Sequence, residues 1–230
     1  MSELLRGVVQ ASTVNRANGD GALIAPRAWP DGSLVFADFV MASVLEGRAF
    51  IANVGTVTTP ITFGGGATIT TTAPDFDLSV PVNTLVIPLE IVVYAEAFGT
   101  NAQFECMAAM GTGGAVAAAT AVTPANLRAD APNATTCTAR RTSSGATYQT
   151  GNVSEFWRDG QQFAITKTTA SATASVSDPN RFVWKWSDAS APPMLFSTSA
   201  ISRLNVFVAG QAPTGFITVK WLELPVAAVG

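Results

Sequence analysis

The sequence contains no histidine. This absence excludes Ser-His-Asp and Cys-His nucleophilic sites and every histidine-ligated metal site, because each depends on an imidazole. Hydrolysis by a pair of carboxylates needs no histidine and stays open. We therefore expect a protein that is not an enzyme, unless two acids prove to form such a pair.

Charged residues are also scarce. They make up 13% of the 230 residues, against roughly 25% in a typical domain. A monomer of this mass exposes on the order of 10,000 Å², so each of its charges would serve roughly 350 Å², which is sparse for a free soluble protein. The composition predicts that much of the surface contacts other subunits. A surface rich in Thr, Ser, Asn and Gln is the alternative.

The net charge is only −3, which creates no strong field toward nucleic acid or an anionic membrane. Residues 49–74 and 106–127 carry no charge, but they are rich in Gly, Thr, Ala and Pro and offer no strongly apolar run of about 20 residues. The first seven residues include Glu3 and lack the apolar core of a secretory signal. We expect no direct nucleic-acid partner, no membrane partner, and synthesis in the cytoplasm.

Cysteine occurs only at Cys106 and Cys137. A disulfide between them would close a loop of about 30 residues and could contribute roughly 3–4 kcal/mol. Two buried, reduced thiols are the alternative, and the missing export signal favours them.

The turn residues divide the chain. Residues 1–32 are interrupted by glycine and proline and cannot form their own core, so they are predicted to be an N-terminal arm. Residues 33–225 are predicted to form one β-sandwich domain, and residues 226–230 a C-terminal tail. Residues 33–46 are ambiguous: a strand buried on both faces is slightly favoured over a helix that is capped by Ser33 and ends at Gly47.

Strand signals dominate after residue 48. A hairpin is predicted around Gly64, Gly65 and Gly66, and Pro88 indicates an edge or a bulge in the strongest strand. Residues 111–152 are weakly patterned and are predicted to be a long loop excursion with a short helix near 116–121. The predicted strands are 58–63, 67–72, 76–80, 85–98, 104–110, 135–141, 163–168, 182–186, 204–208 and 216–224. This spacing predicts an all-β, jelly-roll-like antiparallel β-sandwich.

Several acids and asparagines could carry chemistry. Asp75 with Asp77, or Glu90 with Glu96, could help to bind a calcium ion or act as a hydrolytic acid pair, and Glu155 is a further acid to test. The simpler interpretation is a solvated strand face. Sequons for glycosylation begin at Asn133 and Asn152, although chance matches are common in a chain rich in Asn, Ser and Thr. We expect no catalytic residue, no metal ligand and no cofactor.

An aromatic row offers one further candidate. Phe182, Trp184 and Trp186 would share a strand face, and such a row can stack sugar rings. Core packing is favoured, because Lys185 on the opposite face prefers water. Trp221 is likewise predicted to pack in the core.

Two segments carry a family resemblance: VPVNTLVIPLEI at residues 80–91, followed by AFGT at 97–100, and GFITVKWLELP at 215–225. They resemble β-sandwich virion proteins, especially the capsid cement (decoration) proteins of tailed phages, including short-tailed cyanophages. The second segment also resembles the last strand of single jelly-roll capsid proteins. The resemblance carries no diagnostic motif, so it assigns no role to any residue.

The resemblance implies a homotrimer on the capsid surface of a virion, where it clamps neighbouring capsomers of the major capsid protein. Residues 1–32 and 111–152 are the expected contacts. Two alternatives stay open: a single jelly-roll capsid protein, and a receptor- or carbohydrate-binding fibre-head module.

Overall fold

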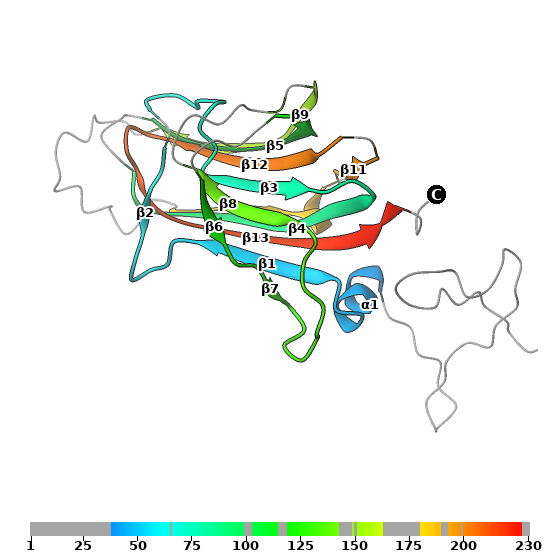
Figure 1. Cartoon of the computed structure of the whole chain (residues 1–230). Coiled ribbons are helices and arrows are strands. Elements are labelled where there is room, and N and C mark those ends of the chain that lie inside the picture. Colours follow the sequence, from blue (N-terminus) through cyan, green and yellow to red (C-terminus); the bar gives the residue numbers. More distant parts are fainter. Residues whose placement is uncertain are drawn as a thin grey trace, which may run out of the picture.

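The computed structural model describes residues 38–64, 66–98, 103–114, 119–142, 149, 151–162, 180–189, 193–198 and 200–226. The predicted arm 1–32, the predicted strand 163–168 and residues 227–230 of the tail lie outside these ranges. Two antiparallel sheets pack face to face (Figure 1). The predicted all-β sandwich is therefore confirmed.

One sheet has seven strands. Its order is β10-β4-β13-β1-β7, with β11 also paired to β4 and β2 to β13. Its strands are β1 (Ala49–Val54), β2 (Ile61–Thr62), β4 (Thr84–Ala97), β7 (Ala125–Asn126), β10 (Arg181–Lys185), β11 (Leu195–Ser197) and β13 (Thr214–Pro225).

The second sheet has six strands in the order β6-β8-β3-β12-β5-β9. Most connections between consecutive strands cross from one sheet to the other. The sandwich thus opposes two sets of four strands: β3, β5, β9 and β12 in this sheet, and β1, β4, β10 and β13 in the other. The strands of the six-stranded sheet are β3 (Phe76–Val80), β5 (Gln103–Thr112), β6 (Ala119–Val122), β8 (Thr138–Thr142), β9 (Gly151–Gln162) and β12 (Ser202–Ala209).

The main core lies between the sheets and follows the strand alternation. Every second residue of the central strands points inward. The inward residues of β3, β12 and β13 are Phe76, Leu78, Val80, Leu204, Val206, Val208, Ile217, Val219 and Trp221.

A bulge in β4 creates a second, smaller core. Lys220 pairs with Glu90 but Trp221 pairs with Pro88, so the register shifts at this point. Beyond the bulge Val86 enters the main core, whereas Ile87 faces outward into a second cluster. The bulge predicted from Pro88 is confirmed. The edge alternative is wrong, because β4 lies between β10 and β13. The bulge also puts Ile87 and Ile91 on opposite faces of the sheet.

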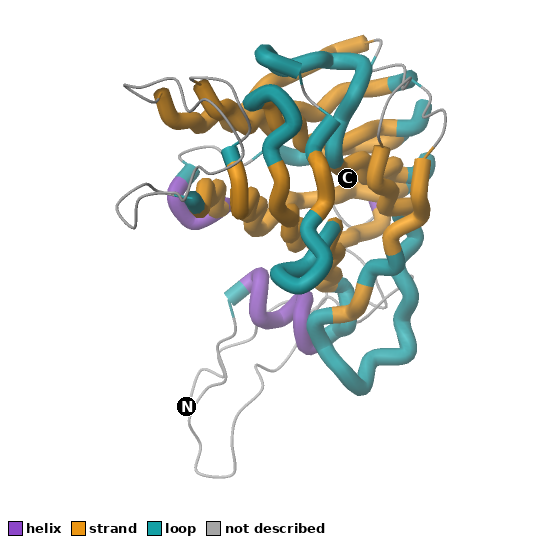
Figure 2. The backbone as a smooth tube through the Cα atoms, turned by 90° about the vertical axis from the view of Figure 1, so that its left-hand side faces the viewer, coloured by secondary structure: helices purple, strands orange, loops and turns teal. Residues whose placement is uncertain are grey.

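The slightly favoured strand over residues 33–46 is wrong where the chain is described. The segment forms α1 (Phe39–Leu45), and the Asp38 side chain caps it by accepting a hydrogen bond from the Met41 N–H at 2.7 Å. Ser33, the expected cap, lies outside the described ranges. Figures 1 and 2 show α1 outside the two strand layers. No helix in the described part of the chain is long and apolar enough to cross a membrane.

The predicted hairpin around Gly64–Gly66 is also wrong. Only Ile61–Thr62 is a strand, and it pairs with β13. Residues 67–72 are not a strand, because Ile69 instead packs on the outer face of the six-stranded sheet against Met107, Ala109 and Phe207.

Residues 111–152 are not simply a long loop. They contribute β6 and β8 beside β3, and β7 beside β1. Only residues 123–124 separate β6 from β7, so the segment folds over the edge of the sandwich and extends both sheets. Residues 119–121 are strand rather than the predicted helix, and 116–118 are not described. The strand predicted at 135–141 corresponds to β8, whereas β9 was not predicted.

Candidate interaction surface

Helix α1 lies on the outer face of the seven-stranded sheet. Val40 and Val44 pack against the second core cluster, which contains Ala49, Leu85, Ile87 and Leu222. The other side of the helix is exposed, yet the sequence FVMASVL contains no charged residue. A surface helix normally presents polar residues to water, so this helix has the composition of one that is covered on both sides.

The carbonyl groups at the end of α1 are held by the 127–137 loop and its flanking strand residue. Arg128 Nη1 donates to the Leu45 carbonyl at 2.6 Å, and Asn133 Nδ2 donates to that of Glu46 at 3.1 Å. Asn126 Nδ2 donates to the Gly47 carbonyl at 2.8 Å. These bonds satisfy acceptors that a helix end leaves unpaired and fix the position of α1.

Gly47 permits this close approach. Its φ is +70°, in the region that favours glycine, and a Cβ atom there would lie 2.9 Å from the Cβ of Ala131. Any larger residue at position 47 would separate the helix end from the loop.

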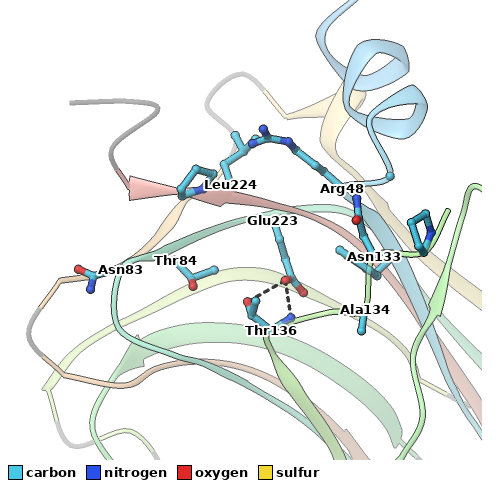
Figure 3. Close-up of a pocket in the computed structure, with 12 residues that line it drawn as sticks. Arg48, Asn83, Thr84, Asn133, Ala134, Thr136, Glu223 and Leu224 are labelled. Carbon is cyan, nitrogen blue, oxygen red and sulfur yellow. Dashed lines mark hydrogen bonds between the residues drawn. The ribbon is translucent and has the colours of Figure 1, made fainter. Parts of the chain in front are cut away.

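Glu223 on β13 anchors the other end of the same loop. Its Oε1 accepts hydrogen bonds from the Thr135 hydroxyl and, at 2.8 Å, from Trp221 Nε1. Its Oε2 accepts from the Thr136 N–H at 2.8 Å and the Thr136 hydroxyl at 2.9 Å (Figure 3). The carboxylate is only 8% exposed, and these four donors replace the water that it loses.

A pocket of about 580 Å³ opens above this carboxylate. Asn83 and Thr84 lie on one side of it, and Asn133 lies on the other (Figure 3). The Glu223 carboxylate already accepts four hydrogen bonds, so its acceptor positions are filled. The Arg48 guanidinium, also beside the pocket, pairs with Glu46 at 2.8 Å. The groups around the pocket are thus engaged mainly in holding the loop and the helix.

Exposed apolar side chains gather at this end of the sandwich. Val82 lies in the β3–β4 turn, Ile201 directly precedes β12, and Phe196 on β11 pairs with Leu85 of β4. Seven of the nine exposed large apolar residues in the described ranges lie on α1, on β11 or beside the strand ends here; Val57 lies in the turn after β1, and Val153 lies on the edge strand β9. We call the seven the apolar end surface: Phe39, Met41, Leu45, Val82, Met194, Phe196 and Ile201.

The size of the apolar end surface can be judged from these exposures. Each of the seven side chains is 42–59% exposed. With about 200 Å² for a whole large side chain, the seven together expose on the order of 600 Å², distributed over α1, the β3–β4 turn, β11 and the residues that flank β11 and β12. Exposed apolar side chains that gather at one end of a molecule mark a site of interaction with other molecules.

Asp75 and Asp77 do not lie on a solvated face, so that interpretation was wrong. Both are buried, at 1% and 0% exposure. Both Asp77 oxygens accept from Arg203 Nη1, at 2.9 and 3.0 Å, and Asn205 Nδ2 donates to one of them at 2.9 Å. The Ser79 hydroxyl donates to the other oxygen at 2.9 Å. Protein donors therefore occupy the carboxylate that was considered as a calcium ligand.

The Asp75 carboxyl joins the loop after β2 to strand β12. It accepts hydrogen bonds from the Gly64 N–H at 2.6 Å and the Val208 N–H at 2.8 Å. Burial raises the pKa of Asp75 from 3.8 to about 7, although the two N–H donors and Arg141 oppose this shift. Burial is the dominant effect because it penalises the charged form.

The raised pKa of Asp75 predicts that protonation of this carboxyl stabilises the folded protein in acid, and that this stabilisation is lost near neutrality. Between pH 4 and about 7 the folded state retains a proton that the unfolded state releases, so the free energy of unfolding falls as the pH rises. The full difference corresponds to roughly 4 kcal/mol. Urea unfolding from pH 4 to 8 would measure it. Asp75→Asn, which does not titrate, should lack this part of the fall; an unchanged pH profile would contradict the assignment.

Glu90 and Glu96 do not form the acid pair that was considered from the sequence. Glu90 pairs with Lys220 at 2.6 Å, and Glu155 on β9 pairs with Arg158 at 2.7 Å, which lowers the pKa of Glu155. Glu90 and Glu96 are six residues apart on one strand, about 20 Å. A glycosidase pair requires about 5–9.5 Å, so these residues are too far apart for that chemistry.

Phe182 and Trp184 are part of the core, as predicted, whereas Trp186 lies outside strand β10 and is only partly buried. Phe182 and Trp184 are 4% and 8% exposed; Phe182 stacks on Phe104 at 4.9 Å, and Trp184 meets the edge of Phe156 at 5.1 Å. Trp186 begins the short helix η1 (Trp186–Asp188) and contacts Phe39 of α1. Trp221 is fully buried, which confirms its packing role.

The cysteines are reduced, as favoured from the sequence. Cys106 and Cys137 are free and buried, and burial raises the pKa of both thiols. Of the two sequon asparagines, Asn133 holds the end of α1, and the side chain of Asn152 is not described. Sequence reasoning missed Glu223 and Arg128, because the contacts that hold the loop and the helix, from Glu223 to Thr135 and Thr136 and from Arg128 to Leu45, join residues that are distant along the chain.

No protein-family model matches the chain, and no curated protein matches its sequence. A functional proposal for it therefore depends on composition, fold and surface.

Proposed function

We propose that this chain is a structural protein of a virus particle, a capsid cement protein that forms a homo-oligomer and ties neighbouring capsomers together. The observation that carries the proposal is the apolar end surface, presented by a sandwich with few charged residues. A protein that works alone in water gains nothing from on the order of 600 Å² of exposed apolar surface. A protein that works in an assembly buries it.

The strand order supports a jelly-roll assignment. Eight strands form two opposed sets, β10-β4-β13-β1 and β3-β12-β5-β9, and a jelly roll likewise packs eight antiparallel strands in two sheets. Viral capsid proteins are among the users of this architecture. A fold alone does not fix a function, so the strand order adds weight to the proposal without carrying it.

Cement function follows from several modest contacts made together. One copy binds weakly at each contact, but an oligomer that engages several sites on a shell binds far more tightly than any single contact. Residues 1–32 and residues 111–152 are the proposed contacts with the major capsid protein. We propose a trimer, which would match three-fold positions on a capsid.

The proposal is tested by the mass of the purified protein and its binding to shells. Light scattering after size exclusion at micromolar concentration should give about three times the 23.8 kDa mass of the chain. The oligomer should co-sediment with expanded tailed-phage capsids and raise their melting temperature. A monomer that binds no capsid would contradict the proposal.

The strand order also favours a second candidate, a single jelly-roll capsid protein. That protein would assemble into closed shells on its own, so electron microscopy of the purified chain separates the two candidates. The fibre-head alternative loses its main support, because Phe182 and Trp184 are buried in the core.

A further inference from the structure

We propose that the apolar end surface joins copies of this chain to one another and does not face the shell. This inference rests on the proposed assembly role and names the partner at one surface, a second copy of the chain. Three observations support it: the chemistry of the surface, its effect on the free protein, and the rigidity of α1.

The chemistry of the surface fits a permanent contact. The seven side chains that define it are all large and apolar. Contacts between identical subunits are more apolar than those between proteins that also exist separately. A standard interface buries about 800 Å² per partner. The seven side chains together expose on the order of 600 Å², which is close to this size.

The solubility that a cement protein needs before it binds a shell also favours a contact between copies. A protein that is added to a finished shell from solution must stay dissolved until it meets that shell. If the apolar end surface were the shell contact, every free molecule would expose it and would tend to aggregate. A contact between copies buries the surface before the shell is reached and leaves the more polar faces for reversible docking.

The rigidity of α1 is the third observation. A helix of seven residues is not stable alone in water, yet Asn126, Arg128 and Asn133 fix its end, and Glu223 fixes the loop that carries two of them. The exposed Phe39, Met41 and Leu45 are thus presented in a set position. Ordering them before association reduces the entropy that binding must overcome.

Two variants of the full-length protein test the contact. The double substitution Met41→Glu, Leu45→Lys places opposite charges on the exposed side of α1 at a spacing that supports the helix. Phe196→Lys charges the same surface from β11. Each should weaken self-association by about a hundredfold or more, so that light scattering at micromolar concentration gives the mass of one chain. Far-UV circular dichroism and the melting transition should still show a folded sandwich.

Val57→Lys is the matched control. Val57 is 71% exposed but lies in the turn after β1, away from the apolar end surface. The control should retain the wild-type oligomeric mass. The inference is wrong if both test variants retain that mass, or if Val57→Lys dissociates the oligomer as they do.

Thiol labelling gives a second measurement. Because Cys106 and Cys137 are buried, a cysteine introduced by Met41→Cys would be the reactive thiol among the described residues. It should be protected in the oligomer and should react rapidly once Phe196→Lys is added. Rapid labelling in the intact oligomer overturns the inference. So does protection in a monomer, because the chain would then cover its own surface.

The result also separates this inference from the proposed function. A wild-type oligomer that binds capsids, with variants of unchanged mass, overturns the inference alone. A wild-type monomer that binds no capsid overturns both.

Discussion

Asp77→Ala is expected to lower the free energy of unfolding by about 3–5 kcal/mol, because it leaves the buried charge of Arg203 without its partner. Asn205 and Ser79 would lose an acceptor in the same step. Urea unfolding followed by tryptophan fluorescence measures the change. A decrease of this size in the free energy of unfolding is exceptional for a single substitution that removes so little core volume.

Glu155→Ala is the matched control for this prediction. It removes an ion pair with Arg158 of similar length from the same sheet, but both side chains are at least 40% exposed. The expected loss is at most about 1 kcal/mol. Equal losses in the two variants would show that the Asp77 network is not the buried, tightly coupled unit that the contacts indicate. The double variant Asp77→Ala, Arg203→Met should recover part of the loss, since it removes both charges.

Glu223→Ala is expected to cost about 2–4 kcal/mol, since it leaves the indole N–H of Trp221 and the backbone N–H of Thr136 without acceptors. It should also release the 127–137 loop from β13 and loosen α1. Hydrogen exchange of the amides at 42–48 should therefore accelerate in this variant. Urea unfolding and exchange measured by mass spectrometry would record the two effects separately.

Glu46→Ala controls for the loss of an acid at the same end of the molecule. Glu46 pairs with Arg48 but is 40% exposed, so its removal should cost less than about 1 kcal/mol. If exchange at α1 is unchanged in Glu223→Ala, the helix is held by its own packing, and the loop does not position it.

Strand alternation explains which parts of the fold could be predicted. In β3, in residues 204–206 of β12 and in residues 217–221 of β13, apolar residues alternate with polar ones, because one side of each strand faces the main core. In α1 the sequence FVMASVL is apolar on every side, so no period separates helix from strand. The short strands β6 and β7 were also not predicted, since four- and two-residue pairings at an edge leave little pattern. The jelly-roll assignment remains a prediction that the strand order supports.

The candidate surface was less predictable than the fold, for a physical reason. Glu223 meets Thr136 across 87 positions of sequence, and Arg128 meets Leu45 across 83. Such contacts form only after both sheets have assembled, and no local spacing of residues in the sequence predicts them. The sparse charge of the composition indicated a shared surface, but it could not indicate where on the molecule that surface lies.

The positions of β12 and β13 have a consequence for biosynthesis. Although both strands come later in the sequence than their partners, β13 pairs with both β4 and β1, and β12 with both β3 and β5. A nascent chain that has not yet released residues 202–225 from the ribosome lacks the middle strand of each layer. Its earlier strands then have edges without partners, which makes them prone to aggregation and dependent on chaperones. Folding must therefore wait until residue 225 has left the ribosome, and a stop codon between residues 202 and 214, which removes the whole of β13, should abolish it.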